Sequence, residues 1–541
     1  AVSASLRLSD TVRILLDYYH LTARDLPDLG GYIPAPTGTG PGAFTRHGPG
    51  DDVPAYAQDE DFLRSRVDTV TARIFIEPFE GFRIINSARY GTTQNGYVVT
   101  GLRGGAFDAG TGGFAPLTLS SHQGWQEVDY FVNQFNALAE FQTGAISHSL
   151  IAGAEYSDQK VLNGLYNVTN TGAFNCRTQG TGDFNAHCLT RADRELVPGD
   201  INRLLGRQVT KDRWDSDWRV KTLSFYLMDT ADITPWLTLH GGVRMDAFSY
   251  SNITQNAQLA ETAYRYKGTL WNGHAGLVAK PHEDGILYLT WGTAKEINGG
   301  ESDLGSSCGY GGVCIVNGVN DVGDGAPESA TNLELGTKWD LFGKRLLVQA
   351  ALFQLTKDDV FESGDADSYS TFGSLNTGKH CVRGVELGLV GAITRRLSGQ
   401  LALAVMESEM LRTIAEPPAS APAGSTYVGK ALSNFANTQF SGQLKYDATD
   451  AFSFGGTATY KSAMYAGQPD SAAIYNFTLD TYTYRVPSYW TFDAFAAYRF
   501  SPNLSARVNV NNIANADYYV AGYRSGHFLY KGDERRATLT L

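Results

Sequence analysis

The sequence predicts an all-β protein, an antiparallel β-barrel that spans a membrane. Three observations carry this prediction. Apolar and polar residues alternate with a period of two along many segments. The apolar face of a strand near the C-terminal end carries aromatic residues at both ends, as the aromatic girdles of a membrane-spanning barrel require. Short connections alternate with long ones along the chain, which gives such a barrel one rim of tight turns and one rim of loops.

The C-terminal segments 486–500, 504–520 and 535–541 show the alternation best. In the first segment one face carries Trp490, Phe492, Ala494, Ala496, Tyr498 and Phe500. The opposite face carries mostly polar residues, among them Thr491, Asp493 and Arg499. In the second segment Leu504, Ala506, Val508 and Val510 oppose Ser505, Arg507, Asn509 and Asn511. Residues two apart share one face of a strand, so each segment has one apolar and one polar face.

The same pattern predicts earlier strands, which bring the total to nineteen. In order they are 3–8, 12–21, 67–79, 82–90, 128–141, 147–156, 221–233, 237–248, 269–279, 286–294, 331–342, 346–357, 381–393, 397–406, 439–447 and 452–461. An antiparallel barrel of a single bacterial chain closes with an even number of strands, so nineteen requires an explanation. Either strands are absent from this chain, or two predicted strands should be counted differently.

Short connections, nearly all containing Asp, Pro, Gly or Ser, are expected at 8–11, 77–81, 143–147, 231–236, 280–285, 340–345, 392–398, 447–452 and 500–504. Long connections are expected at 25–65, 91–125, 157–220, 248–268, 295–329, 357–380, 407–438, 462–488 and 514–535. Loops of this length are uncommon in a compact soluble domain. We therefore expect all of residues 1–541 to form one barrel domain.

The composition excludes other classes. The chain has 541 residues, of which 43% are hydrophobic and 12% aromatic, and it contains no apolar run long enough for a membrane-spanning helix. Its net charge of −12 argues against nucleic acid as a partner, because nucleic-acid-binding proteins carry a basic excess.

The closing segment resembles that of TonB-dependent outer-membrane receptors, in which an Asn-rich strand end and a Tyr-Tyr pair precede a Gly and an Arg. The matching residues are Asn512, Ile513, Asn515, Tyr518, Tyr519, Gly532 and Arg535. Segments 327–342, 383–397 and 288–296 resemble internal strands of the same family. Segment 15–34, with Pro27, Asp28, Gly30 and Pro34, resembles the catecholate-type siderophore receptors.

The resemblance implies a 22-stranded barrel whose lumen holds an N-terminal plug domain. Matching from the C-terminal end, we expect the plug and the first three strands to be absent from this chain. The implied function is import of a ferric siderophore across the outer membrane of a Gram-negative bacterium, driven by the TonB–ExbB–ExbD system acting through the plug. Outer-membrane lipid and lipopolysaccharide are implied neighbours, and a monomer is expected. The alternatives are a plugless, porin-like passive channel, or the same receptor type with a corrinoid, haem or saccharide as cargo.

Two cysteine pairs lie within single predicted loops, Cys176 with Cys188 and Cys308 with Cys314. Two local disulfides are consistent with passage through an oxidising compartment, while unpaired thiols are the alternative. We expect neither catalytic residues nor a resident metal or cofactor, and ferric iron only as part of the cargo. The histidines show no metal-ligand spacing, and segment 305–309 has the G-x-S-x-G pattern of hydrolases without the flanking strand and helix.

An anionic ferric catecholate is best bound by cationic and aromatic side chains together. Candidates near the loop rim are Arg103, Trp125, Arg213, Trp214, Trp218, Tyr310, Tyr482 and Arg485. For Trp125, Trp214 and Trp218 the alternative is a place in the outer aromatic girdle.

Overall fold

The computed structural model describes residues 1–27, 57–102, 117–170, 206–297, 327–362, 376–467, 471–522 and 528–541, together with the short strands and the turn named below. Among these residues strands dominate. The described part includes one 3-10 turn, η1 (Ile201–Arg203), and in it no helix is long and apolar enough to cross a membrane.

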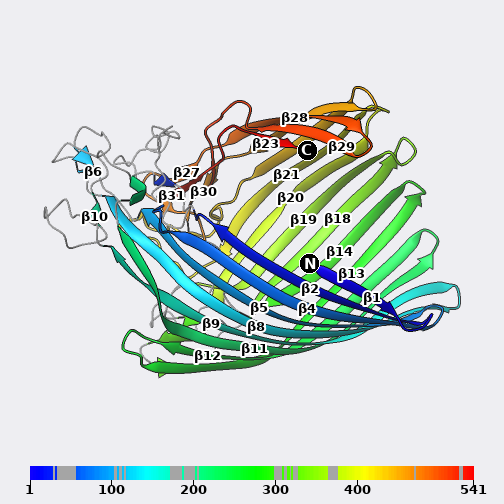
Figure 1. Ribbon diagram of the computed structural model, residues 1–541, viewed down its shortest axis with the longest axis horizontal. Coiled ribbons are helices and arrows are strands. Elements are labelled where there is room, and N and C mark those ends of the chain that lie inside the picture. Colours follow the sequence, from blue (N-terminus) through cyan, green and yellow to red (C-terminus); the bar gives the residue numbers. More distant parts are fainter. Residues whose placement is uncertain are drawn as a thin grey trace.

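One large sheet forms the wall (Figure 1). Its strands are β1 (Val2–Arg7), β2 (Val12–Asp25), β4 (Phe62–Phe79), β5 (Phe82–Leu102), β8 (Leu117–Thr143), β9 (Ile146–Asn170), β11 (Arg207–Thr234), β12 (Leu237–Gln255), β13 (Glu261–His282), β14 (Gly285–Glu296), β18 (Glu328–Leu341), β19 (Leu346–Phe361), β20 (Asn376–Ala392), β21 (Leu397–Arg412), β22 (Thr438–Asp447), β23 (Phe452–Lys461), β28 (Tyr489–Ser501), β29 (Leu504–Asn511) and β32 (Arg536–Thr540). The twentieth strand of the sheet, β10 (Ala186–His187), is a two-residue addition beside β8.

Each wall strand pairs antiparallel with the next one along the chain, and the predicted nineteen wall strands are confirmed. Among the described residues β1 pairs only with β2, and β32 pairs only with β29. The sheet therefore has two open edges, which Figure 1 shows at the N- and C-terminal ends of the chain.

The two faces of the sheet differ as the alternation predicts. On β12, Val243, Met245 and Ala247 point to one face, and Arg244 and Asp246 point to the other. We call these the outer face and the inner face. Large apolar side chains remain exposed along the outer face, for example Phe225 at 49% and Trp271 at 56%. An apolar outer face suits contact with a bilayer, and a polar inner face suits contact with a water-filled lumen.

Polar side chains on the inner face contact one another from strand to strand. Arg73 is ion-paired with Asp17 at 2.7 Å. Arg244 contacts Glu155 at 2.9 Å and Asp246 at 2.8 Å. These cross-strand contacts neutralise the charges that the wall turns toward the lumen.

The predicted alternation of short and long connections is confirmed, but several strand ends were placed wrongly. The connections predicted at 91–125 and 157–220 include strand: β5 continues to Leu102, β8 starts at Leu117, β9 continues to Asn170 and β11 starts at Arg207. Backbone pairing extends beyond the apolar band into segments where polar residues occupy both faces. The apolar period of two is lost there, so the sequence carries no strand signal.

The remaining strands are short and belong to the long connections. They are β3 (Gly31–Tyr32), β6 (Phe107–Asp108), β7 (Gly113–Phe114), β15 (Cys308–Gly309), β16 (Val313–Val316), β17 (Val319–Asn320), β24 (Met464–Tyr465), β25 (Tyr475–Asn476), β26 (Thr481–Tyr482), β27 (Arg485–Val486), β30 (Tyr519–Gly522) and β31 (Phe528–Lys531). Several of them gather at the left end of Figure 1, which we call the loop rim. The opposite end, with the tight turns, is the turn rim.

The loop that follows β2 and the loop that precedes β32 are paired at the loop rim. β3 and β30 both pair with β31, which forms a three-stranded sheet. This sheet joins the two ends of the open wall, although the wall edges β1 and β32 form no ladder with each other among the described residues. The curvature of the wall is thus fixed on its loop side by backbone hydrogen bonds.

The residues of the closing motif form one hydrogen-bonded turn after β29. Asn512 has a φ of +48°, and its side-chain amide donates to the carbonyls of Ala516 at 2.9 Å and Asp533 at 3.0 Å. Its backbone N–H donates to the Asp493 carboxylate at 2.8 Å. A Cβ on Gly532 would lie 2.0 Å from the Tyr518 ring, so only glycine fits there. The motif therefore fixes the approach of the last strand.

A buried ion pair ties the ends of neighbouring wall strands together at the loop rim. The Arg207 and Asp61 side chains are 1% and 0% exposed, and Arg207 Nη1 lies 2.5 Å from Asp61 Oδ1. The Asp61 carboxylate also accepts from the backbone N–H groups of Gln58 and Thr100, each at 2.9 Å. Arg207 donates in addition to Ser121 Oγ at 2.8 Å. The segment just before β4 and the loop-rim ends of β5, β8 and β11 are held by this one pair.

Removing Arg207 should be strongly destabilising, because it leaves the Asp61 carboxylate buried without its counter-ion. We expect Arg207→Ala to lower the free energy of unfolding by about 3–5 kcal/mol, measured by denaturant titration in detergent micelles. Lys211→Ala is the control, since the Lys211–Glu127 pair at 2.7 Å is about half exposed and should contribute less than ~1 kcal/mol. Equal losses in the two variants would contradict the structural role given to the buried pair.

Candidate functional site

Three long connections pack into one unit at the loop rim. They are residues 413–437 between β21 and β22, residues 462–488 between β23 and β28, and residues 512–535 between β29 and β32, each in its described part. Their shared core consists of Ala436, Met464, Val486 and Tyr519, each at most 2% exposed. We call this unit the loop assembly. Its apolar core makes it a folded part of the protein rather than a set of separate loops.

Hydrogen bonds between the connections fix the loop assembly further. The Asn434 side chain donates to the Gly522 carbonyl at 2.7 Å and accepts from the Gly522 N–H at 2.9 Å. The Ala473 N–H donates to the Ala431 carbonyl at 2.9 Å, and the Asn434 N–H donates to the Tyr465 carbonyl at 2.6 Å. Side chains carried by different connections therefore keep fixed relative positions.

Five aromatic rings and one cation meet in the loop assembly. The rings of Tyr465 and Tyr482 stack with centroids 4.0 Å apart and an interplanar angle of 16°. Tyr475 meets Tyr482 edge to face at 4.9 Å. Phe477 lies 5.2 Å from Tyr475 and 5.0 Å from Tyr427. Lys430 Nζ is 3.7 Å from the Tyr475 ring centroid. These six residues are the aromatic cluster, and all are half-buried.

The hydroxyls of Tyr475 and Tyr482 stay protonated at neutral pH, because the pKa of each is raised. Partial burial, together with a 2.6 Å hydrogen bond donated to Asp480, raises the pKa of Tyr475 to about 12. Burial also raises the pKa of Tyr482, although the hydrogen bond from the Ala431 N–H acts in the opposite direction. The cluster thus offers neutral aromatic faces, hydroxyl donors and one ammonium group. Such a set suits a ligand that is aromatic and negatively charged.

Two of the predicted site residues lie at the aromatic cluster. Tyr482 belongs to it, and Arg485 on β27 is exposed and pairs through the backbone with Tyr465 on β24. Four others lie on β8 and β11, on a different part of the wall. Arg103 and Tyr310 lie outside the described residues. A ligand-binding role for any of the eight stays a prediction.

The predicted residues on β8 and β11 make structural contacts. Trp125 is 7% exposed, donates from Nε1 to the Leu165 carbonyl at 2.9 Å and covers Gly164. Trp218 packs in a core with Val161 and Tyr250. Arg213 Nη1 donates to the Gln255 carbonyl at 2.9 Å and to the carbonyl of its neighbour Trp214 at 3.3 Å.

Sequence reasoning missed Lys430, Tyr427, Tyr465, Tyr475 and Phe477. The sequence did carry one signal for this cluster. Four tyrosines fall within segment 475–489, namely Tyr475, Tyr482, Tyr484 and Tyr489. Nothing in the sequence showed that residues 427 and 430, which belong to another connection, meet this segment.

Of the two predicted disulfides, only the pair Cys308 and Cys314 lies in described residues. The backbone ladder of β15 and β16 pairs Cys308 directly with Cys314. Cys176 and Cys188 lie outside the described residues. Cys381 is buried, with Sγ 4.0 Å from Thr356 Oγ1. Within the described part of the chain no group of three metal-ligating side chains comes together.

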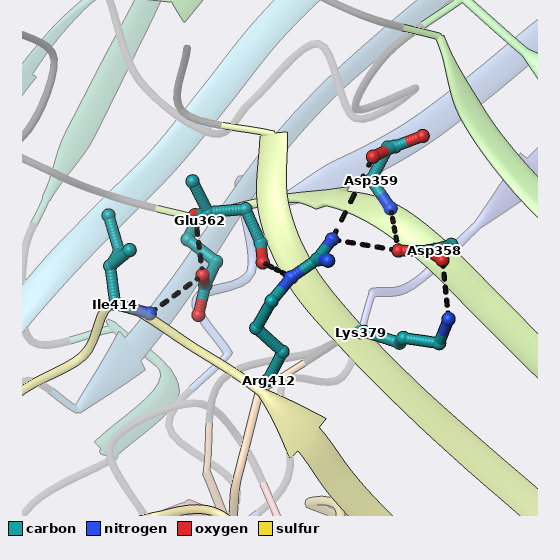
Figure 2. Close-up of polar contacts among 7 residues, drawn as sticks. Asp358, Asp359, Glu362, Lys379, Arg412 and Ile414 are labelled. Carbon is teal, nitrogen blue, oxygen red and sulfur yellow. Dashed lines mark hydrogen bonds and ion pairs between the residues drawn. The ribbon is translucent and has the colours of Figure 1, made fainter. Parts of the chain in front are cut away.

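A second polar cluster lies at the loop-rim ends of β19, β20 and β21 (Figure 2). Asp358 accepts from Lys379 at 2.6 Å and from Arg412 at 2.8 Å. Glu362 accepts from Thr377 at 2.6 Å and from the Ile414 N–H at 3.1 Å. Partial burial acts to raise the pKa of Asp358, but the Lys379 hydrogen bond and the Arg412 charge outweigh it and hold this pKa below its ordinary value. The charges here neutralise one another, and Glu362 anchors the start of the loop assembly.

The open wall of long antiparallel strands, the loop assembly and the closing motif define a class of protein. Residues 13–513 match the family described as TonB dependent receptor-like, beta-barrel, and the chain belongs to that family. Proteins of this family lie in the outer membrane of Gram-negative bacteria.

Individual relatives are receptors for transport, not enzymes. The chain is 26% identical over 573 residues to the catecholate siderophore receptor Fiu of Escherichia coli K12, and the match covers 100% of this chain and 68% of Fiu. It is 27% identical over 557 residues to the probable TonB-dependent siderophore receptor PiuA of Acinetobacter baumannii, covering 100% of this chain and 69% of PiuA.

Solved structures share the fold. The crystal structure of the siderophore receptor PiuA from Acinetobacter baumannii superposes with a TM-score of 0.79 at 23% identity, over 99% of this chain and 72% of PiuA. The closed form of the ferric-catecholate import receptor Fiu from E. coli K12 gives a TM-score of 0.75 at 24% identity, over 99% of this chain and 73% of Fiu.

The Asp480 carboxylate should account for part of the raised pKa of Tyr475. Its negative charge and its accepted hydrogen bond both favour the protonated phenol, so Asp480→Asn should lower the pKa of Tyr475 from about 12 toward 10. Tyrosinate absorbance is titrated in the protein and in Tyr475→Phe, and again in the Asp480→Asn background. The difference within each pair isolates Tyr475 from the other tyrosines, and an unchanged difference curve would refute the assignment.

Proposed function

We propose that this chain forms the barrel wall of a TonB-dependent receptor that imports a ferric siderophore of the catecholate type. The observation that carries the proposal is the aromatic cluster, in which tyrosine and phenylalanine rings surround Lys430 at the loop rim. The name of the relative Fiu, a catecholate siderophore receptor, supports the same cargo class, and the name of PiuA supports a siderophore as cargo.

A ferric tris-catecholate presents aromatic edges and faces around a complex of net negative charge. Offset or edge-on ring contacts with the cluster tyrosines would bind the catechol rings. Lys430 and the exposed Arg485 would supply positive charge, and the Tyr482 hydroxyl, which accepts from the Ala431 N–H, would donate its own proton to a catecholate oxygen. Ferric iron enters this scheme as part of the cargo, and all contacts are made to its ligand.

Transport through the wall requires a path and a gate. The inner face supplies a polar surface through contacts such as Arg244 with Glu155. We assign the gate to a plug domain coupled to the TonB–ExbB–ExbD system. This chain covers 68% of Fiu and 69% of PiuA, so a protein of their length has room for such a domain. In this scheme the loop assembly captures cargo, and the plug admits it to the lumen.

Binding tests the cargo class directly. A soluble ferric tris-catecholate is titrated against the protein as its source cell makes it, and quenching of intrinsic fluorescence is measured. Tyr475→Ala and Tyr482→Ala should each raise the Kd by roughly 2- to 12-fold, since an aromatic contact contributes about 0.5–1.5 kcal/mol. Tyr446→Ala is the matched control, because Tyr446 packs on Phe454 on the outer face of β22 and β23 and should leave the Kd unchanged.

Absence of saturable binding in the unsubstituted protein would reject the catecholate. The same titration with a corrinoid, haem and an oligosaccharide identifies the competing cargo classes.

The gate is tested by the intact mass of the protein as its cell makes it and by its conductance in planar bilayers. We expect a mass above that of this chain by the size of a plug and three strands, and no steady ion current. A mass equal to that of this chain together with an open, unregulated conductance would favour a passive, porin-like channel.

A further inference from the structure

Asp480 places a negative charge at the aromatic cluster, the site to which we have assigned an anionic cargo. Its carboxylate accepts a hydrogen bond from the Tyr475 hydroxyl at 2.6 Å, and the residue is exposed. Lys430 Nζ lies over the face of the same tyrosine ring, 3.7 Å from its centroid. One tyrosine therefore has a cation at its ring face and a carboxylate at its hydroxyl end.

Asp480 is held in position by the hairpin that β25 and β26 form. The ladder between these strands pairs Tyr475 with Tyr482. The Asn476 side chain caps the turn between them, because its oxygen accepts from the backbone N–H groups of residues 478 and 479 at 3.1 and 3.0 Å. Together with the hydrogen bond from Tyr475, these contacts fix the position of the Asp480 carboxylate.

Neither the backbone nor the hydrogen bond at position 480 requires a negative charge. Asp480 has a φ of +50°, in the left-handed region, which glycine and asparagine adopt at least as readily as aspartate. The amide oxygen of an asparagine would also accept from the Tyr475 hydroxyl. A neutral residue would thus satisfy the fold, and the negative charge is the property that the fold leaves unexplained.

The charge of Asp480 is not neutralised by the part of the protein that the structure describes. Among those residues no Lys, Arg or His side chain lies within ion-pair distance of its carboxylate. One carboxylate oxygen accepts from Tyr475, and a carboxylate can accept further hydrogen bonds at both oxygens. Asp480 is therefore able to accept from a positively charged donor on a bound molecule.

Opposite charges on one ring act differently on the parts of a bound molecule. An anionic iron chelate is attracted by Lys430 and the exposed Arg485 and is repelled by Asp480. A positively charged side arm on the same molecule has the opposite preference. We propose that Asp480 determines specificity, favouring catecholate chelates that carry an ammonium group over chelates that are anionic throughout. This inference rests on the proposed function, because it concerns the cargo of the same aromatic cluster.

A purely structural role for Asp480 has a different consequence. As a mere acceptor for Tyr475, Asp480 would leave the cargo charge without influence, and its loss would weaken all cargo alike. A charge-assisted hydrogen bond to an ammonium group should instead strengthen binding on the order of 10-fold. Repulsion of an anionic chelate by an exposed carboxylate should weaken binding by roughly 2- to 5-fold. The two effects have opposite signs for the two kinds of cargo.

The test uses two ferric complexes of catechol amides. In one complex each ligand ends in a primary amine, which is protonated at neutral pH, and in the other this amine is acetylated. The iron, the catechol rings and the linker are the same. Each complex is titrated against the protein as its source cell makes it, by quenching of intrinsic fluorescence. The unsubstituted protein should bind the ammonium complex more tightly, on the order of 10-fold.

Variants assign this preference to Asp480, since the acidic chain as a whole also attracts cations. Asp480→Asn should weaken binding of the ammonium complex on the order of 10-fold and tighten binding of the acetylated complex roughly 2- to 5-fold. Asp480→Glu keeps the charge and should keep the direction of the preference. Glu283→Gln removes one negative charge from an exposed turn on the turn rim and should leave both affinities within about two-fold.

The possible failures are distinguishable. Equal binding of the two complexes by the unsubstituted protein would overturn the role of Asp480 and leave the catecholate proposal standing. Parallel weakening of both complexes in Asp480→Asn, or the same change in Glu283→Gln, would overturn that role as well. Absence of saturable binding of either complex would reject the catecholate proposal itself, and this inference with it.

Discussion

The constraint on which this structure depends is backbone hydrogen bonding in a medium without water. A strand that crosses hydrocarbon must pair every N–H and C=O group with protein, and a sheet that continues around the wall provides this pairing. The ladders from β2 to β29 run without a break between neighbouring strands, with only local irregularities such as that between Lys211 and Trp214. Side chains are then free to differ on the two faces, and the connections are free to differ at the two rims.

Sequence reasoning succeeded where the need to pair the backbone in hydrocarbon also imposes a pattern on the side chains. Period-two alternation located all nineteen wall strands, since each must turn apolar residues outward. It missed the loop-rim ends of β5, β8, β9 and β11. Outside the bilayer both faces of a strand contact water, so the strand continues without the alternation of apolar and polar residues that would reveal it. The closing motif was recognisable because Asn512 and Gly532 occupy positions that few residues tolerate.

The candidate site was less accessible to prediction for a different reason. Tyr482 was identified from its type and place, but its partners arrive from separate connections, Lys430 before β22 and Tyr465 just after β23. Contacts between loops depend on how the loop assembly packs around Met464 and Tyr519, and no period in the sequence encodes that packing. The Trp residues on β8 and β11 were chosen by the same chemical criterion. Trp125 and Trp218 contact neighbouring strands, and a binding role for them stays a prediction.

The count of wall strands has a consequence for closure of the barrel. Because the wall strands alternate in direction and are odd in number, β1 and β32 point the same way, and a seam joining them directly would be parallel. An antiparallel seam takes an odd number of strands between these edges.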